Sequence, residues 1–126
     1  MSNPDKQNDK HHGSCHCGKV RYEVTLDLAA GPVMACNCSM CGRKGTLLTF
    51  VPAEHFTLLA GEDALTHYQF NKKIIDHSFC STCGVTSFAR GTNPRDGKPM
   101  VAINARCLEG VDTQALAVKH FDGAKM

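Results

Sequence analysis

The sequence predicts a mainly β domain that is stapled by zinc and has few or short helices. Three observations lead to this prediction. Apolar and polar residues alternate over short stretches, which is the pattern of half-buried strands. Turn-forming glycine, proline, asparagine and aspartate recur between these stretches, and no stretch carries a sustained apolar stripe with the 3.6-residue period of a helix. Short strands at this spacing are typical of a folded-over sheet or a small sandwich.

The clearest strand lies over residues 20–26, where Val20, Tyr22, Val24 and Leu26 alternate with polar residues. Further strands are expected over 46–51, 56–60, 65–70, 74–79, 85–89 and 100–104. Strands 56–60 and 65–70 are joined across Gly61-Glu62-Asp63, and 74–79 and 85–89 form a hairpin. Helical structure is expected only as one turn near 52–54 and as a short helix over 111–116.

Length and charge limit the classes of function. A chain of 126 residues forms one domain, which we expect over 13–126 after a disordered polar tail at 1–12. His11 and His12 in this tail are expected to be bystanders. The 14 Lys and Arg against 12 Asp and Glu are spread along the chain, so neither nucleic acid nor a membrane surface is an expected partner. Unpaired cysteines at this density, without an export signal at the start, favour the cytoplasm.

Seven of the eight cysteines fall into three clusters, Cys15-His16-Cys17, Cys36-Asn37-Cys38-Ser39-Met40-Cys41 and Cys80-Ser81-Thr82-Cys83. Zinc requires thiolates that converge on one point at about 2.3 Å. A C-x-C pair in a strand points both thiols to one face, and a C-x-x-C pair does the same in a tight turn, which Gly84 favours here. Disulfides are the competing explanation, but C-x-C spacing suits a bond between its two cysteines poorly. The clusters therefore predict metal binding.

Seven thiolates exceed the four that one tetrahedral zinc accepts, so two zinc ions per chain are expected. A four-thiolate site is closed and structural, whereas three protein ligands leave a position for water or substrate. The paired cysteines would make the closed site: Cys15, Cys17, Cys80 and Cys83. The triple segment would hold the second, more easily lost zinc: Cys36, Cys38 and Cys41.

Spacing alone leaves other partitions open. Cys15 and Cys17 could join the triple segment instead, or a histidine could close the triple site. The candidate histidines for this role are His16, His55, His77 and His120. Cys107 lies outside every cluster beside apolar residues, and we expect it to be a small buried hydrophobe.

These motifs carry a family resemblance over residues 13–123. The segments Gly13-Ser14-Cys15-His16-Cys17-Gly18-Lys19-Val20, Cys36-x-Cys38-x-x-Cys41, Phe79-Cys80-x-x-Cys83-Gly84 and His120-Phe121-Asp122-Gly123 resemble the glutathione-dependent formaldehyde-activating enzyme family, which includes the centromere protein V group. The resemblance implies an Mss4-like β-tent fold and the same division into a four-cysteine structural zinc and a three-cysteine active zinc. Asn37 and Gly42 depart from the family pattern, which commonly has a histidine and a basic residue there.

The resemblance also implies a reaction, the addition of glutathione to formaldehyde, classed with the carbon-sulfur lyases. The hypothesis from the residues is that a substrate thiol completes the zinc on Cys36, Cys38 and Cys41 and then attacks an aldehyde. No convincing general base stands out, although Arg43, Glu54 and His55 lie near in sequence. Two alternatives remain at this point: a thiol carrier without turnover, and a structural zinc module that binds a protein partner.

Overall fold

The computed structural model describes residues 10–28, 33–37, 40–69, 76–93 and 95–122, and within these ranges its strands form two sheets. The smaller sheet is antiparallel, in the order β1 (Lys10–Ser14), β2 (Arg21–Thr25) and β5 (Phe56–Ala60). The larger sheet has the order β10 (Val118–Phe121), β3 (Val33–Cys36), β4 (Leu48–Pro52), β9 (Pro99–Asn104), β8 (Phe88–Thr92), β7 (Asp76–Cys80) and β6 (Leu65–Tyr68). All its pairs are antiparallel except β10 with β3.

Helical structure in the described ranges is short. The α-helix α1 (Cys41–Lys44) follows β3 and ends at Gly45, whose φ of 69° is the left-handed conformation common after a helix. Single 3-10 turns are η2 (Ala53–His55), η3 (Glu62–Ala64), η4 (Ala105–Cys107) and η5 (Thr113–Ala115). No described helix has both the length and the apolar character that crossing a bilayer requires.

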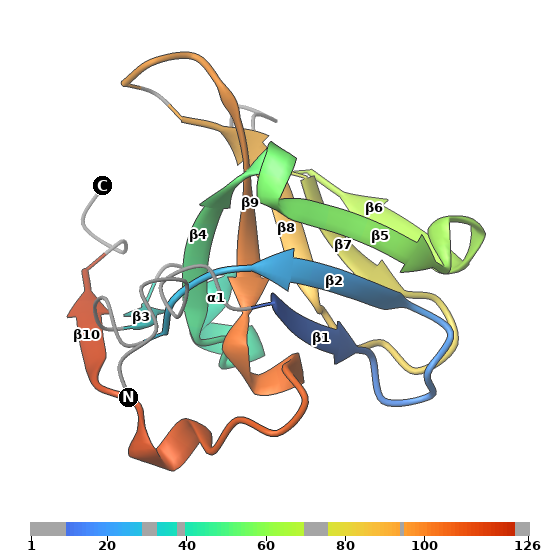
Figure 1. Cartoon of the computed structure of the whole chain (residues 1–126), viewed down its shortest axis with the longest axis horizontal. Helices are drawn as coiled ribbons and strands as arrows, with labels where there is room; N and C mark the ends of the chain where they lie inside the picture. The colour runs from blue at the N-terminus through green and yellow to red at the C-terminus, as the bar shows by residue number, and fades with distance from the viewer. Residues whose placement is uncertain (1–9, 29–32, 38–39, 70–75, 94, 123–126) are drawn as a thin grey trace.

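The core lies between the two sheets. In Figure 1 the strands of the smaller sheet run across those of the larger one, which stands behind them. Tyr22 from β2 is fully buried, and its ring lies 5.4 Å from Phe56 and 5.9 Å from Phe88, centroid to centroid. Since Phe56 belongs to one sheet and Phe88 to the other, this aromatic group joins them. The alternation in β2 therefore has its expected cause, with Tyr22 and Val24 facing inward.

The mainly β prediction is confirmed, and several boundaries differ from it. Strand 56–60 has the predicted bounds, whereas the strand expected over 85–89 begins at Phe88. The predicted helix over 111–116 is only the 3-10 turn η5, too short to bury an apolar face. Residues 65–70 were expected to form one strand, of which Leu65–Tyr68 is seen as β6 and residue 70 lies outside the described ranges.

Two expectations were wrong, one about the extent of the N-terminal tail and one about the pairing of two strands. The tail was predicted to extend through His12, but Lys10–His12 belong to β1 and pair with Glu23–Thr25. Backbone hydrogen bonds and the 2.9 Å ion pair of Lys10 Nζ with Glu23 Oε1 hold this edge strand without an apolar pattern. The second concerns β5 and β6, which were expected to form a hairpin across Gly61 but do not pair with each other. They lie in different sheets, so the connection carries the chain from one sheet to the other.

Candidate metal centres and adjoining cavities

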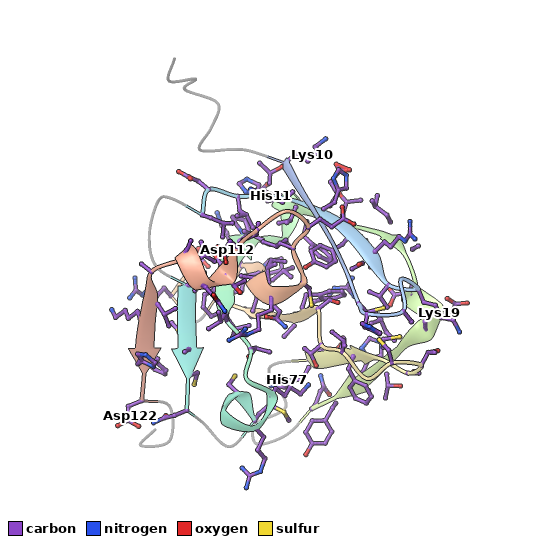
Figure 2. All side chains as sticks on the ribbon, turned by 90° about the horizontal axis from the view of Figure 1, so that it is seen from below. Lys10, His11, Lys19, His77, Asp112 and Asp122 are labelled. Atoms are coloured by element: carbon purple, nitrogen blue, oxygen red, sulfur yellow. The ribbon has the colours of Figure 1, made fainter. Side chains whose placement is uncertain are left out.

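The structure brings together the thiols that were predicted to form the closed site. Cys15 and Cys17 lie in the connection between β1 and β2, Cys80 ends β7, and Cys83 lies in the β7–β8 connection. Their four sulfur atoms all lie within 4.8 Å of one another. We call these residues the four-cysteine cluster. Figure 2 shows sulfur atoms beside the labelled Lys19, whose Nζ donates a 3.1 Å hydrogen bond to Thr82 Oγ1 in the other turn.

The spacing of these sulfur atoms fits a tetrahedral metal ion. Cys17 Sγ lies 3.6 Å from Cys15 Sγ and 3.6 Å from Cys80 Sγ. Thiolates held at about 2.3 Å from one zinc ion would stand about 3.8 Å apart along each edge of the tetrahedron. The observed separations are also far longer than the ~2.05 Å of a disulfide bond. The cluster is therefore a site that could hold one metal ion in an S4 environment.

Local backbone structure orients the thiols. The backbone N–H of Val20 donates to Cys15 Sγ and that of Thr82 donates to Cys80 Sγ, each at 3.4 Å. Both turns need a residue with positive φ, which Gly18 supplies at 84° and Gly84 at 79°. Such N–H donors stabilise negative sulfur, so the two turns are matched to thiolate ligands.

The thiols of the cluster differ in acidity. Burial opposes ionisation of Cys83, but hydrogen bonds from the backbone N–H of Val85 and from neighbouring groups outweigh it and lower its pKa to about 6. Cys17 receives a backbone hydrogen bond at Lys19 that favours the thiolate, yet burial and the neighbouring thiols raise its pKa to about 11. A backbone hydrogen bond at Cys83 and another at Thr82 lower the pKa of Cys80 as well. The cluster thus favours thiolate at Cys80 and Cys83 and opposes it at Cys17, and a bound cation would relieve the crowding of negative charge.

The predicted open site is described only in part. Cys36 ends β3 and Cys41 begins α1, while Cys38 lies outside the described residues. Within the described ranges, the four-cysteine cluster is the only group of three or more potential ligands close enough to share a metal ion. The candidate histidines His16, His55, His77 and His120 do not belong to any such group there.

Cavities distinguish the second cysteine group from the first. Cys36 lines three cavities, of about 300, 250 and 460 Å³, and Cys41 lines the last two. The 300 Å³ cavity also contains both departures from the family pattern, Asn37 and Gly42. Asn37 Nδ2 donates a 3.0 Å hydrogen bond to Asp122 Oδ1, joining the end of β3 to the end of β10. None of the four-cysteine cluster lines any of these three cavities.

The other candidate side chains from the sequence also fall into two groups, those that line the cavities at Cys36 and those that do not. His120 lines two of the cavities at Cys36, and His77 lines the 250 Å³ cavity. Arg43, Glu54 and His55 line none of the three. Glu54 instead lines a separate cavity beside Pro52. Cys107 is half-buried, where a buried hydrophobe was expected, and its Sγ donates to the Thr86 carbonyl at 3.7 Å.

Lys44 is a functional candidate that the sequence analysis missed. It lies three residues after Cys41 in α1, a spacing that places both on one helix face, and both line the 250 Å³ cavity. Its Nζ donates a 2.6 Å hydrogen bond to Thr86 Oγ1. Burial lowers the pKa of Lys44, an effect that the nearby Cys41 opposes. Burial, and then the charge of Lys44, lower the pKa of His77.

These observations define the class of the protein as a mainly β fold with a four-thiol cluster that could hold a metal ion. The family profile for the glutathione-dependent formaldehyde-activating enzyme matches residues 10–121. The chain therefore belongs to this family.

Individual relatives are similar to parts of the chain. Two proteins that carry the family's name, from Talaromyces marneffei and Penicillium rubens, are 35% and 32% identical over 80 residues. These alignments cover 60% of this chain and 42% and 41% of the relatives, so the chain spans less than half the length of either. A crystal structure of a Rhodobacter sphaeroides protein superposes with a TM-score of 0.75 at 28% identity, over 87% of this chain and 99% of that one.

Proposed function

We propose that the protein catalyses addition of a thiol, glutathione, to a small aldehyde such as formaldehyde, forming an S-hydroxymethyl adduct. The reaction belongs with those of carbon-sulfur lyases. One observation carries the proposal: Cys36 and Cys41 line cavities, whereas the four-cysteine cluster lines none of these. Thiols that line a cavity suit chemistry with a small molecule, and four thiols gathered between two turns suit a structural role. Family membership supports the thiol and the aldehyde.

The proposal assigns two zinc ions. The four-cysteine cluster holds the structural one, in keeping with its sulfur separations. Cys36, Cys38 and Cys41 hold the second, where Cys38 is included on the sequence motif. A zinc ion with three protein thiolates would supply a positive centre that lowers the pKa of an arriving thiol. The donor set fits zinc, which favours sulfur ligands.

The surrounding side chains suit the two substrates. Glutathione carries carboxylates, and the 460 Å³ cavity at Cys36 offers Arg106, Gln114 and His120 to polar groups. In the addition a sulfur–carbon bond forms, the carbonyl π bond breaks, and the proton of the thiol ends on the former carbonyl oxygen. Lys44 is the cationic side chain of the cavity that it shares with Cys41, so its ammonium is placed to stabilise negative charge on that oxygen.

A titration with glutathione tests whether the second metal accepts a thiol. In cobalt-substituted protein that carries two metals per chain, thiolate-to-cobalt absorption should grow with glutathione and stay unchanged with S-methylglutathione, which has no ionisable thiol. Absence of growth would favour a closed second site and the structural alternative.

Exchange NMR then separates an enzyme from a carrier. The wild-type protein should accelerate exchange between glutathione plus formaldehyde and the adduct, relative to Cys38→Ser at equal concentration. Cobalt absorption that responds to glutathione, together with equal exchange rates for both proteins, would identify a thiol carrier and refute the proposed catalysis.

A further inference from the structure

An apolar hollow lies on the outer face of the larger sheet, beside Cys36 and Cys41. Its floor is a cross-strand row with one residue from each of four adjacent strands, Phe50 (β4), Ala102 (β9), Ala89 (β8) and His77 (β7). Val51 and Val101, the next residues along β4 and β9, are buried in the core. Since successive side chains point to opposite faces of a sheet, the row faces away from the core.

The depth of the hollow comes from the two alanines. They stand in the middle of the row, between the phenyl ring of Phe50 and the imidazole of His77. Two methyl groups flanked by two rings leave a depression in the surface of the sheet. Larger side chains at these two positions would fill it. Met34 and Leu48, paired across β3 and β4, extend the apolar lining.

Residues of α1 and Phe121 of β10 also line the hollow, and its volume is about 250 Å³. A dry apolar cavity of about 150 Å³ is large enough for benzene. Formaldehyde has two non-hydrogen atoms and is closer in size to one water molecule, which takes about 30 Å³ in the liquid. The hollow is therefore several times larger than formaldehyde requires.

Besides His77 in the floor, the polar side chains that line the hollow are Lys44 of α1, Thr46, Thr86 and Asn104. The Asn104 amide is engaged with the fold, since its Nδ2 donates to the Thr86 carbonyl at 2.9 Å and its Oδ1 accepts from the backbone N–H of Leu47 at 3.3 Å. The Lys44 ammonium has three N–H donors, and one of them donates a hydrogen bond to Thr86 Oγ1. A ligand with one polar end and an apolar body thus matches this site, with the polar end toward Lys44 and Cys41.

We infer that this hollow binds the apolar side chain of an aldehyde, so that the preferred carbonyl substrate is an aromatic or medium-chain aliphatic aldehyde instead of formaldehyde. The inference rests on the proposed function, because it names the second substrate of the same reaction. Glutathione itself is polar and charged, which suits the cavity that contains Arg106 and Gln114 better than this one. Cys36 lines both cavities, so the two substrates approach it from different sides.

The reaction is the same addition with a larger carbonyl compound. The sulfur of glutathione bonds to the carbonyl carbon, the carbonyl π bond breaks, and the proton from the thiol ends on the oxygen. The product is a hemithioacetal, and no electron acceptor or donor is consumed.

A binding experiment tests the hollow without catalysis. Benzyl alcohol, an unreactive analogue of benzaldehyde, should shift the methyl resonances of Met34 and Met40, which both line the hollow. The Ala102→Leu variant fills the floor and should lose these shifts at the same ligand concentration. Ala60→Leu makes the same exchange on β5, where Ala60 is exposed, and should keep them.

A kinetic experiment tests the preference. With glutathione, the wild-type protein should show a kcat/KM for benzaldehyde at least about tenfold above that for formaldehyde, after correction for the uncatalysed rates. Ala102→Leu should remove this preference by lowering kcat/KM for benzaldehyde more than kcat/KM for formaldehyde, while Ala60→Leu behaves as wild type.

The outcomes separate this inference from the proposed function. Formaldehyde catalysis with no preference for benzaldehyde and no shifts from benzyl alcohol would overturn the inference and leave the proposed function standing. Benzyl alcohol binding without catalysis of any aldehyde would refute the proposed function, and the aldehyde assignment with it, leaving an apolar ligand site of another kind.

Discussion

The Sγ atoms of Cys17 and Cys80 lie 3.6 Å apart, although 63 residues separate them in the chain. Cys17 lies in the turn between β1 and β2 of the smaller sheet, and Cys80 ends a strand of the larger one. The four-cysteine cluster therefore joins the two sheets at one end, as the aromatic rings of Tyr22, Phe56 and Phe88 join them in the core. A metal ion held there would stabilise the packing of the sheets and not only its own turns.

Cys80→Ser should therefore remove one metal ion per chain and destabilise the whole fold. Loss of one of four ligands is expected to lower the free energy of unfolding by about 3 kcal/mol, or the thermal midpoint by about 10 °C. Metal analysis and thermal unfolding measure both effects. Cys107→Ser is the matched control, because Cys107 lies outside the cluster, and it should keep the metal. Equal thermal midpoints for the two variants would contradict a structural role for the cluster.

Lys44→Met should lower the rate of thiol addition while leaving the fold and metal content unchanged. The substitution keeps an apolar side chain in the cavity lining and removes the cation that, in the proposed function, stabilises negative charge on the carbonyl oxygen. We expect kcat/KM to fall about 10- to 100-fold, as for loss of a single electrostatic donor. Lys44→Arg should recover part of the rate. A Lys44→Met enzyme with the wild-type rate would exclude this role.

Gly61→Ala should destabilise the fold through a steric effect. The φ of Gly61 is 98°, and a Cβ atom there would lie 2.7 Å from Val20 Cα and also overlap the Lys19 carbonyl oxygen. Backbone strain and overlap together predict a loss of roughly 2–4 kcal/mol in urea unfolding. Gly45→Ala is the control, since Gly45 also has positive φ, 69°, but open space around it, and it should lose only about 1 kcal/mol. Similar losses of stability in the two variants would show that backbone strain acts without a contribution from steric overlap.

Tyr22→Phe should leave stability unchanged or increase it by about 1 kcal/mol at neutral pH. The Tyr22 hydroxyl is buried without a hydrogen-bond partner in the described part of the chain, so its removal relieves an unsatisfied polar group. Tyr22→Ala, by contrast, should lose about 3–5 kcal/mol because it empties the aromatic core. Urea unfolding at neutral pH compares the three proteins. A clear loss in Tyr22→Phe would mean that the hydroxyl has a partner.

The Tyr22 hydroxyl also predicts that the stabilities of the wild type and Tyr22→Phe diverge at alkaline pH. Burial raises the pKa of Tyr22 in the folded protein, whereas in the unfolded chain it ionises near 10. Above pH 10 the unfolded chain loses this proton and the folded protein keeps it, so stability falls as pH rises. The wild type should lose about 1.4 kcal/mol per pH unit more than Tyr22→Phe in this range. Parallel pH profiles of the two proteins would contradict the prediction.

Local patterns predicted much of the fold, because they depend on neighbouring residues. The alternation through Tyr22 and Val24 identified β2. The C-x-C and C-x-x-C pairs were the favoured ligands of one site, but spacing alone left other partitions open, and the structure brings these four thiols together. The edge strands β1 and β10 were missed, since their residues are largely polar or exposed and backbone pairing alone defines them. The separation of β5 from β6 was missed as well, because partner choice depends on the rest of the sheet.

Sequence motifs indicate candidate ligands for the site at Cys36 and Cys41, but they do not indicate which residues surround them. Cys36 and Cys41 are marked by their motif, but nothing in the sequence relates them to Ala89 or Ala102. These alanines become neighbours only through the register of β8 with β9, which pairs residues 13 positions apart in sequence. Lys44 could have been recognised from its helical spacing to Cys41, had α1 been expected.

The two alanines in the floor of the hollow also bear on how such a protein could change during evolution. Their strands are held by a continuous ladder, and the opposite face of the same strands carries core residues such as Val101 and Ile103. The depth of the hollow thus depends on side-chain size at two positions, without any loop that must move. Single codon changes at Ala89 or Ala102 could widen or narrow the range of accepted ligands while the core and the cysteine ligands stay intact, so selectivity can drift separately from stability.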